Sequence, residues 1–159
     1  VTVIEDGMRT PNGLAVDEAR GRLYLSDSHR DVRTIWSRDL DLASGALGEK
    51  RVFAEAEGKD GRPDGGAIDQ TGHYWSAAVE GARIDVFDPS GTRVSTLATP
   101  MPDPTKIAFG GADLSLIYLT SKAGDGDGDG GVLAVAETTA RGRAPAPFAP
   151  TRSNHRSLD

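Results

Sequence analysis

An internal repeat limits most strongly how this chain can fold. The stretches PNGLAVDEARGRLYLSDS at 11–28 and PDGGAIDQTGHYWSAAV at 63–79 share proline, an asparagine or aspartate, glycine, and then alanine, a β-branched residue and aspartate. A third copy, PTKIAFGGADLSLIYLTS at 104–121, keeps the proline and the apolar residues but has threonine and lysine after the proline. Because the copies begin about 40 to 50 residues apart, they are typical of propeller blades or of a similar array.

Each copy is followed by a second half that predicts further strands. The segments at 34–47 and 82–94 are predicted to form hairpins, because DLASG and DPSG supply the residues that turns prefer. The segment VLAVAE at 132–137 is also strand-like. Val, Ile, Leu, Tyr and Trp fill the predicted strands, and no segment holds a helical period over three turns. Within the repeats themselves we predict strands near 12–17, 22–27, 65–69, 73–79, 105–109 and 115–120.

About four short strands per unit, repeated along the chain, predict an all-β fold of the β-propeller type. Propellers close with roughly 4–8 four-stranded blades, and this sequence supplies about three. The opening VTVIE at 1–5 is predicted to be the outer strand of a preceding blade. A three-unit β-sandwich is the alternative for the same strand pattern. We assign 1–149 to the propeller and expect 150–159 to be a disordered tail.

The order of these motifs resembles that of the senescence-marker-protein, gluconolactonase and regucalcin-like family of lactonases. The resemblance rests on PNGLAVD, LYLSDS, GRPDGGAID, RIDVFDPSG and PTKIAFGGADLSLIYLTS, and it covers about 1–149. It implies a six-bladed β-propeller, of which this chain is the C-terminal half, with a divalent cation on the central axis. It also implies an enzyme that hydrolyses lactones or similar esters.

Asn12 and Asp64 are the candidate site residues. Alone, Asn-Gly and Asp-Gly are turn formers. Their equivalent places in successive repeats favour a functional role, because radial repetition places equivalent residues on a ring around the axis. Asn12 offers a neutral oxygen and Asp64 a charged one, which are the ligand types that calcium takes. The resemblance implies that both are metal ligands, for Ca²⁺ or for another divalent cation such as Zn²⁺ or Mg²⁺. Asp64 is also the candidate catalytic residue.

The rest of the site implied by the resemblance lies outside this sequence. The third copy offers Pro104, Thr105 and Lys106, so we expect it to contribute shape and no ligand. The family's glutamate ligand and its substrate-orienting arginine and asparagine belong to earlier blades. We therefore expect this chain to hold part of an active site, to be inactive alone, and to need the N-terminal half to close the propeller.

Other polar residues have structural interpretations. Asp17 and Asp69 follow the predicted inner strands and are expected to be turn residues. Asp27 and Ser28 either support Asn12 or make a contact between blades. The loop GDGDGDGG at 124–131 matches the start of an EF-hand loop but lacks its final glutamate and its flanking helices. We expect a solvated acidic loop there.

Composition narrows the function classes. The formal net charge of −6 argues against a nucleic-acid partner. No apolar run is long enough for a transmembrane helix. The absence of cysteine excludes a thiol nucleophile and is compatible with a reducing compartment, so we expect a cytoplasmic protein. The three histidines lack metal-site spacing, and no G-x-S-x-G motif occurs, which argues against a Ser-His-Asp enzyme. Trp36 and Trp75 are expected in the core between blades.

Two function hypotheses remain. The first is a metal-dependent hydrolase acting on a small lactone or ester, in which the cation polarises the substrate carbonyl and positions or activates water. The second is a non-catalytic propeller that binds calcium or serves as a scaffold. The paired Asn12 and Asp64 at repeat-equivalent positions favour the enzyme.

Overall fold

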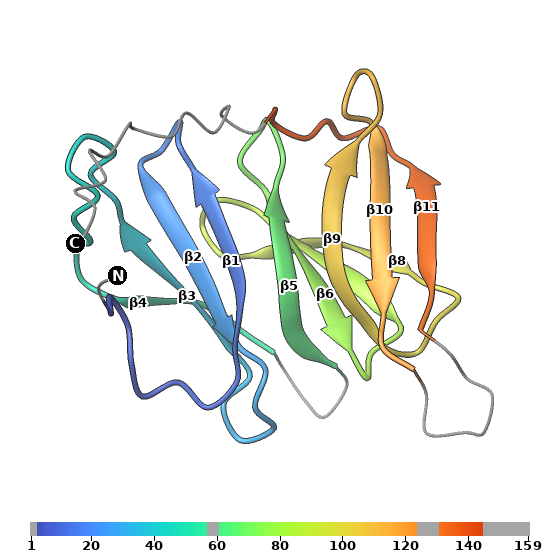
Figure 1. Cartoon of the computed structure of the whole chain (residues 1–159), viewed down its shortest axis with the longest axis horizontal. Coiled ribbons are helices and arrows are strands. Elements are labelled where there is room, and N and C mark those ends of the chain that lie inside the picture. Colours follow the sequence, from blue (N-terminus) through green and yellow to red (C-terminus); the bar gives the residue numbers. More distant parts are fainter. Residues whose placement is uncertain (1–2, 57–60, 124–130, 145–159) are drawn as a thin grey trace, which may run out of the picture.

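The computed structural model describes residues 3–56, 61–123 and 131–144, and this part of the chain contains eleven β-strands and no helix. The strands form three antiparallel sheets, each with its strands in chain order (Figure 1). The first sheet consists of β1 (Pro11–Asp17), β2 (Arg22–Asp27), β3 (Thr34–Asp39) and β4 (Arg51–Glu55). The second consists of β5 (Arg62–Ile68), β6 (Tyr74–Val79), β7 (Arg83–Phe87) and β8 (Arg93–Ala98). The third consists of β9 (Pro104–Gly110), β10 (Leu116–Ser121) and β11 (Leu133–Glu137).

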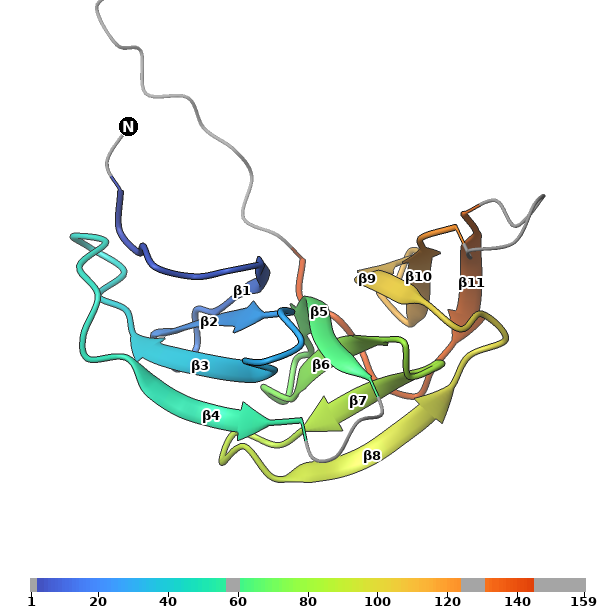
Figure 2. The ribbon, with the colours of Figure 1, turned by 90° about the horizontal axis from the view of Figure 1, so that it is seen from below.

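The three sheets follow one another along an arc, as blades of a propeller do. Figure 2 shows β1, β5 and β9 on the inner side of the arc and β4 and β8 on the outer side. The inner strands run in the same direction (Figure 1), and β5 packs against both β1 and β9. Equivalent residues of the three repeats therefore lie at the same end of neighbouring inner strands. The predicted all-β propeller is confirmed, and the sandwich alternative is wrong.

Strands occur at all six places predicted within the repeats, and two details differ from the sequence analysis. The third sheet has three strands in the described part of the chain. The residues Val3–Glu5 of the opening segment lie outside any strand, so this part of the predicted outer strand is wrong. Glu5 instead accepts hydrogen bonds from Arg38 of β3, at 2.8 Å, and from Lys50, at 2.7 Å. These contacts tie the opening segment to the first sheet through side chains.

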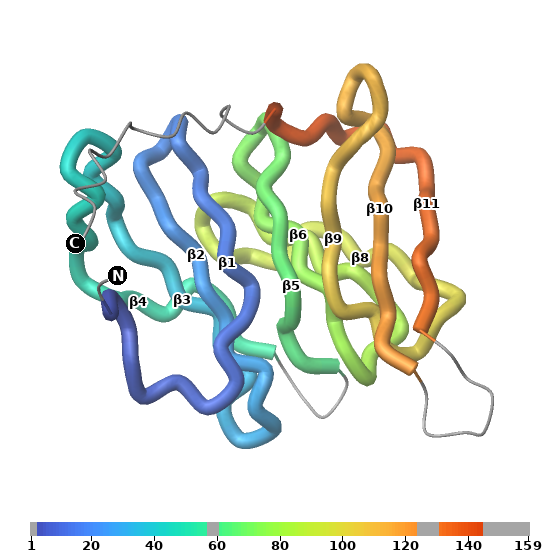
Figure 3. Tube along the Cα trace, viewed as in Figure 1, coloured from blue at the N-terminus to red at the C-terminus, as the bar shows by residue number. Residues whose placement is uncertain are grey.

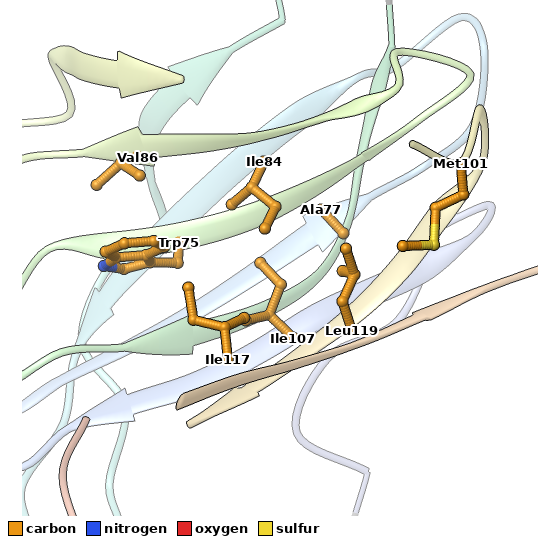
Figure 4. Packing of buried hydrophobic residues seen from close by; sticks show 8 residues of the cluster. All are labelled: Trp75, Ala77, Ile84, Val86, Met101, Ile107, Ile117 and Leu119. Carbon is orange, nitrogen blue, oxygen red and sulfur yellow. The ribbon is translucent and has the colours of Figure 1, made fainter. Parts of the chain in front are cut away.

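The hydrophobic core lies between the sheets. Side chains alternate along a strand, so a sheet that is covered on both faces buries both sets. All six residues of β6 are buried. Tyr74 packs into a cluster shared with the first sheet, whereas Trp75 and Ala77 pack into a cluster shared with the third (Figure 4). The cluster between the first and second sheets contains Tyr24, Ile35, Phe53, Ala54, Ile68, Tyr74 and Phe87.

The two tryptophans have different environments. Trp75 is 5% exposed and packs edge-to-face on Phe109 of the third sheet, with ring centroids 5.3 Å apart. The predicted role between blades is therefore confirmed for Trp75. Trp36 is half-buried, and Lys50 Nζ lies 4.9 Å from its ring centroid. Trp36 lies on the face of the first sheet away from the second sheet, where the described residues supply no further sheet, so its predicted role between blades stays a prediction.

The segment after the third sheet returns to the second. In Figure 3 the Cα trace after β11 crosses to the end of β5, where Gly142 forms an isolated bridge with Asp69. The predicted tail at 150–159 and residues 124–130 of the predicted acidic loop lie outside the described residues. In the described residues there is no helix with the length and apolar character needed to cross a membrane.

Close packing between the first two sheets depends on Gly66. A Cβ atom at this position would collide with the Tyr74 hydroxyl, which donates a 2.8 Å hydrogen bond to the Gly13 carbonyl. We expect Gly66→Ala to lower the free energy of unfolding by about 2–3 kcal/mol, because a buried overlap must be relieved by moving the backbone or the ring. Gly48→Ala is the control, since the nearest atom to its added Cβ, on Asp39, lies at 3.3 Å. Equal thermal unfolding shifts for the two variants would contradict this packing argument.

Candidate metal centre

The two repeated tripeptides lie inside β1 and β5, in β-bulges. The register shifts between Asn12 and Ala15 in β1 and between Pro63 and Gly66 in β5, so each inner strand has one extra residue there. Gly13 takes a φ of 65°, which glycine adopts without strain. Bulges change the direction of side chains beside functional sites. A β-bulge therefore positions each candidate ligand, at the same end of two adjacent inner strands.

A single hydroxyl connects the two candidate ligands. Ser28, just after β2, is 3% exposed. Asn12 Nδ2 donates to Ser28 Oγ at 2.9 Å, and Ser28 Oγ lies 3.4 Å from Asp64 Oδ1. Asn12 and Asp64 are both partly buried. The structure thus brings the two predicted residues together. Ser28 contacts Asn12 in its own sheet and Asp64 in the next sheet, so both interpretations given for Ser28 apply.

The surroundings of Asp64 disfavour its charged form. Burial raises the pKa of this carboxyl group, and the nearby Ser28 hydroxyl and the positive charges of Arg62 and Lys106 compensate only in part. A carboxylate that lacks full compensation for its burial attracts a proton or a cation. The site therefore favours a positive ligand at Asp64.

Lys106 of the third repeat reaches over β5 toward this site. Its Nζ donates a hydrogen bond to the Gly66 carbonyl, and a Cβ atom at Gly65 would stand 2.5 Å from its Cδ. Desolvation lowers the pKa of Lys106, and the Asp64 carboxylate acts against this shift. The third repeat was expected to contribute shape alone. In the structure it also contributes a cationic group, which the sequence analysis missed.

A hollow of about 580 Å³ opens beside the bulges. Its lining includes Met8, Asn12, Gly13, Gly65 and Lys106. This volume lies within the range of small-molecule sites, roughly 300–1,000 Å³. Most of the remaining lining comes from the opening segment and from apolar side chains of the first sheet, and Asp64 is not part of it, so the hollow adjoins the site on the Asn12 side.

The remaining aspartates of the repeats have structural roles. Asp27 accepts backbone hydrogen bonds from Arg9, Thr10 and His29, at 2.8–2.9 Å, and so fixes the loops beside Asn12. At the far ends of the inner strands, Asp17 pairs with Arg20 at 2.8 Å.

Asp69 closes a turn. Its Oδ1 accepts from the backbone of Thr71 and His73, at 2.9 and 3.0 Å, and Trp75 Nε1 donates to its Oδ2 at 3.0 Å. The predicted turn role of Asp69 is therefore confirmed.

The donor set fits a hard cation but is small. An amide and a carboxylate supply the oxygen ligands that calcium and magnesium take, whereas zinc in proteins prefers nitrogen and sulfur. Among the described residues, no group of three or more His, Cys, Asp or Glu side chains comes together as a metal site. The described part of the chain therefore offers two oxygen ligands, and further ligands must come from water, from a substrate or from other residues.

The unfavourable charge of Asp64 predicts a stability change that needs no metal. Because its pKa is raised on folding, the carboxyl group costs stability at pH values above the raised pKa. With a chelator at pH 7, we expect Asp64→Asn to raise the free energy of unfolding by about 1 kcal/mol. The gain should shrink as the pH falls through the raised pKa and vanish below the ordinary carboxyl pKa, where both side chains are neutral.

Denaturant unfolding at several pH values measures this effect. Asp31→Asn is the matched control, because the Asp31 side chain is 74% exposed and lies on the loop beside Ser28. A less stable Asp64→Asn variant at pH 7 would contradict the electrostatic argument.

Comparison with known proteins gives the relatives of the chain. A family model described as SMP-30/Gluconolactonase/LRE-like region matches residues 1–123. Pentonolactonase XacC of Haloferax volcanii is 37% identical over 131 residues, which are 82% of this chain and 44% of the relative. A 6-deoxy-6-sulfogluconolactonase of Pseudomonas putida is 38% identical over 119 residues, which are 75% of this chain and 40% of the relative.

A solved structure has the same arrangement of strands. The luciferin-regenerating enzyme aligns with a TM-score of 0.76 and 28% identity, over 88% of this chain and 49% of the other. The chain thus spans less than half of the length of each of these three proteins.

Proposed function

The chain belongs to the SMP-30/gluconolactonase/LRE-like family, and from that premise we propose that it forms part of a divalent-metal-dependent hydrolase of sugar lactones. One observation carries this proposal. Asn12 and Asp64, at equivalent places in adjacent repeats, meet at the hydroxyl of Ser28, and Asn12 also lines a hollow of substrate size.

In the proposed site, Asn12 Oδ1 and the Asp64 carboxylate hold the cation. We assign Ca²⁺ as the first choice, because both ligands are oxygens and calcium accepts irregular sets of oxygen ligands. When bound, the cation supplies Lewis-acid polarisation of the lactone carbonyl and favours loss of a proton from water. The glycines beside the ligands, Gly13 and Gly65, let the protein pack closely here, since Ser26 and Tyr74 fill the side-chain space of Gly13 and Lys106 fills that of Gly65.

Asp64 also receives a proton in the proposed reaction. Water attacks the carbonyl carbon of the lactone, and its proton passes to an Asp64 oxygen. The bond between the carbonyl carbon and the ring oxygen then breaks, and the proton goes to the departing ring oxygen. Burial raises the pKa of Asp64, which makes its carboxylate a better proton acceptor than an exposed one. The product is the open-chain hydroxy acid.

The proposed substrates are lactones of five- and six-carbon sugar acids. Support comes from the two relatives, which are named as a pentonolactonase and a 6-deoxy-6-sulfogluconolactonase. Lys106, at the edge of the hollow, supplies a hydrogen-bond donor for the hydroxyl-rich substrate.

The proposal includes residues beyond this sequence. We infer that further blades close the propeller, cover the open sheet faces and complete the ligand set, because the chain spans less than half of its relatives. A cytoplasmic location is part of the proposal, for which the absence of cysteine is the support.

A lactone assay on the whole protein, with the remaining blades present, tests the function. Sugar lactones open spontaneously, so the rate must be compared with the same buffer and cation without protein. We expect turnover that a chelator removes and Ca²⁺ restores. Cation binding without any acceleration would instead support the non-catalytic calcium-binding or scaffold alternative.

A further inference from the structure

Ser28 has a contact pattern that the proposed function leaves unused. We propose that Ser28 is a positioning residue, whose hydroxyl turns the Asn12 amide so that its carbonyl oxygen faces the cation site. This inference rests on the proposed metal centre and deepens it. The positions of the protons fix which end of the Asn12 amide Ser28 can contact.

The Ser28 hydroxyl has a single proton to donate. Ser28 Oγ lies 2.7 Å from the carbonyl oxygen of Pro63, in a buried contact. A carbonyl oxygen can only accept, so Ser28 must be the donor in this hydrogen bond. This is the usual distance for a well-formed hydrogen bond from a hydroxyl donor. The hydroxyl proton is therefore committed to the backbone of β5.

The Asn12 amide is the second group in contact with the Ser28 hydroxyl. Having donated its proton, the Ser28 oxygen can only accept from other groups. Asn12 lies 2.9 Å away and must therefore present its NH₂ group, which is how the structure places it. The two ends of an amide point in opposite directions, so the Asn12 carbonyl oxygen is turned away from Ser28. The orientation of Asn12 thus follows from the Pro63 carbonyl oxygen, which can only accept a hydrogen bond.

The Asp64 carboxylate is the third group near the Ser28 hydroxyl. Ser28 Oγ lies 3.4 Å from Asp64 Oδ1, longer than its 2.7 Å bond to Pro63. The carboxylate therefore does not compete well for the hydroxyl proton and stays available to a cation. Ser28 thereby orients the neutral ligand without neutralising the charged one.

The backbone holds Ser28 itself in place. Its N–H donates to the Thr10 carbonyl at 2.9 Å, and its carbonyl accepts from Arg62 Nη1 at 2.8 Å. Arg62 is held in turn by Glu80, 2.7 Å from its Nη2. A hydroxyl on a backbone that is fixed from both sides can select one orientation of a neighbouring amide.

Ser26 provides a matched control. It is also buried, at 0% exposure, and also lies at the junction of the first two sheets. Its Oγ contacts the backbone carbonyls of Pro63 and Asp64, at 3.4 and 3.2 Å. Removal of the Ser26 hydroxyl therefore perturbs the same junction without freeing the Asn12 amide.

Calcium titration of the whole protein tests the inference, with Ca²⁺ alone as the probe and calorimetry as the readout. We expect Ser28→Ala to raise the calcium dissociation constant about 10- to 100-fold, the range observed when groups that orient metal ligands are removed. Ser28→Thr, which keeps a hydroxyl, should restore most of the affinity. Ser26→Ala should leave it within about threefold.

The same substitution in an Asn12→Asp background separates the positioning of the Asn12 amide from general support of the fold. Asn12→Asp replaces the amide with a carboxylate, whose two oxygens are equivalent, so no wrong orientation exists. In that background the Ser28 oxygen has no proton to donate to the carboxylate, so Ser28→Ala should cost less than about threefold in calcium affinity or should raise it. The same large loss in both backgrounds, or unchanged affinity of Ser28→Ala alone, would overturn the inference. A wild-type protein that binds no Ca²⁺ would instead overturn the proposed metal centre, and the positioning role would fall with it.

Discussion

Asp64→Ala in the whole protein is expected to reduce metal-dependent lactone hydrolysis about 10³-fold or more in kcat/KM. The substitution removes the only charged ligand that the described residues supply to the proposed site, and it removes the group that accepts the proton from water. Loss of a general base alone typically costs about 10²–10⁴-fold. Steady-state hydrolysis of a sugar-acid lactone with saturating Ca²⁺, corrected for spontaneous opening, measures this effect.

Asp31→Asn is the control for Asp64→Ala, because it removes an exposed carboxylate from a neighbouring loop. Its activity should equal that of the wild type. Calcium titration of Asp64→Ala, run beside the assay, separates a lost cation from a lost base. Unchanged turnover in Asp64→Ala would remove Asp64 from the mechanism and leave Asn12 without its charged partner.

The second large effect concerns the 159 residues expressed alone. Apolar side chains are exposed on the outward face of the third sheet, where Tyr118, Leu133 and Val135 are 41%, 72% and 58% exposed. Tyr118 pairs with Val135 across β10 and β11, so these side chains share one face. At the other end of the arc, Leu14 is 65% exposed. Contiguous exposed apolar faces on a sheet favour association.

We therefore expect the isolated chain to dimerise or aggregate and to hydrolyse lactones poorly or not at all. Adding the remaining blades, in the same chain or as a second chain, should restore a monodisperse species and at least most of the activity. Sedimentation velocity beside the lactone assay measures both properties. A stable and active monomer of these 159 residues would show that the site is complete within them, and that the assignment of missing ligands is wrong.

The sequence predicted the sheets because their signals are local. Turn residues, β-branched strands and the repeated tripeptide define each unit without knowledge of its neighbours. Asn12 and Asp64 could be paired from the repeat alone, and the structure places them at one hydroxyl. Their roles as metal ligands stay predictions.

The features that the sequence did not predict depend on contacts between sheets. Ser28 was left with two interpretations, because its partners lie 35 and 36 residues away on the next sheet. Lys106 was assigned to shape, because nothing local indicates that its side chain crosses to β5. The segment Val3–Glu5 has strand-forming residues, but a strand also needs a hydrogen-bonding partner, which composition does not reveal.

The second sheet packs against both of the other sheets, and this limits which substitutions the chain tolerates. A substitution in β6 meets a neighbour on either face, so a change in volume cannot be accommodated by moving outward into solvent. The outer strand β8 is under little such constraint, since nearly all its residues are exposed. Substitutions in β8 should therefore be tolerated better than substitutions in β6. Sequence similarity between the units should therefore be lost first in the outer strands and kept longest in the inner strands, where the repeat is still recognisable.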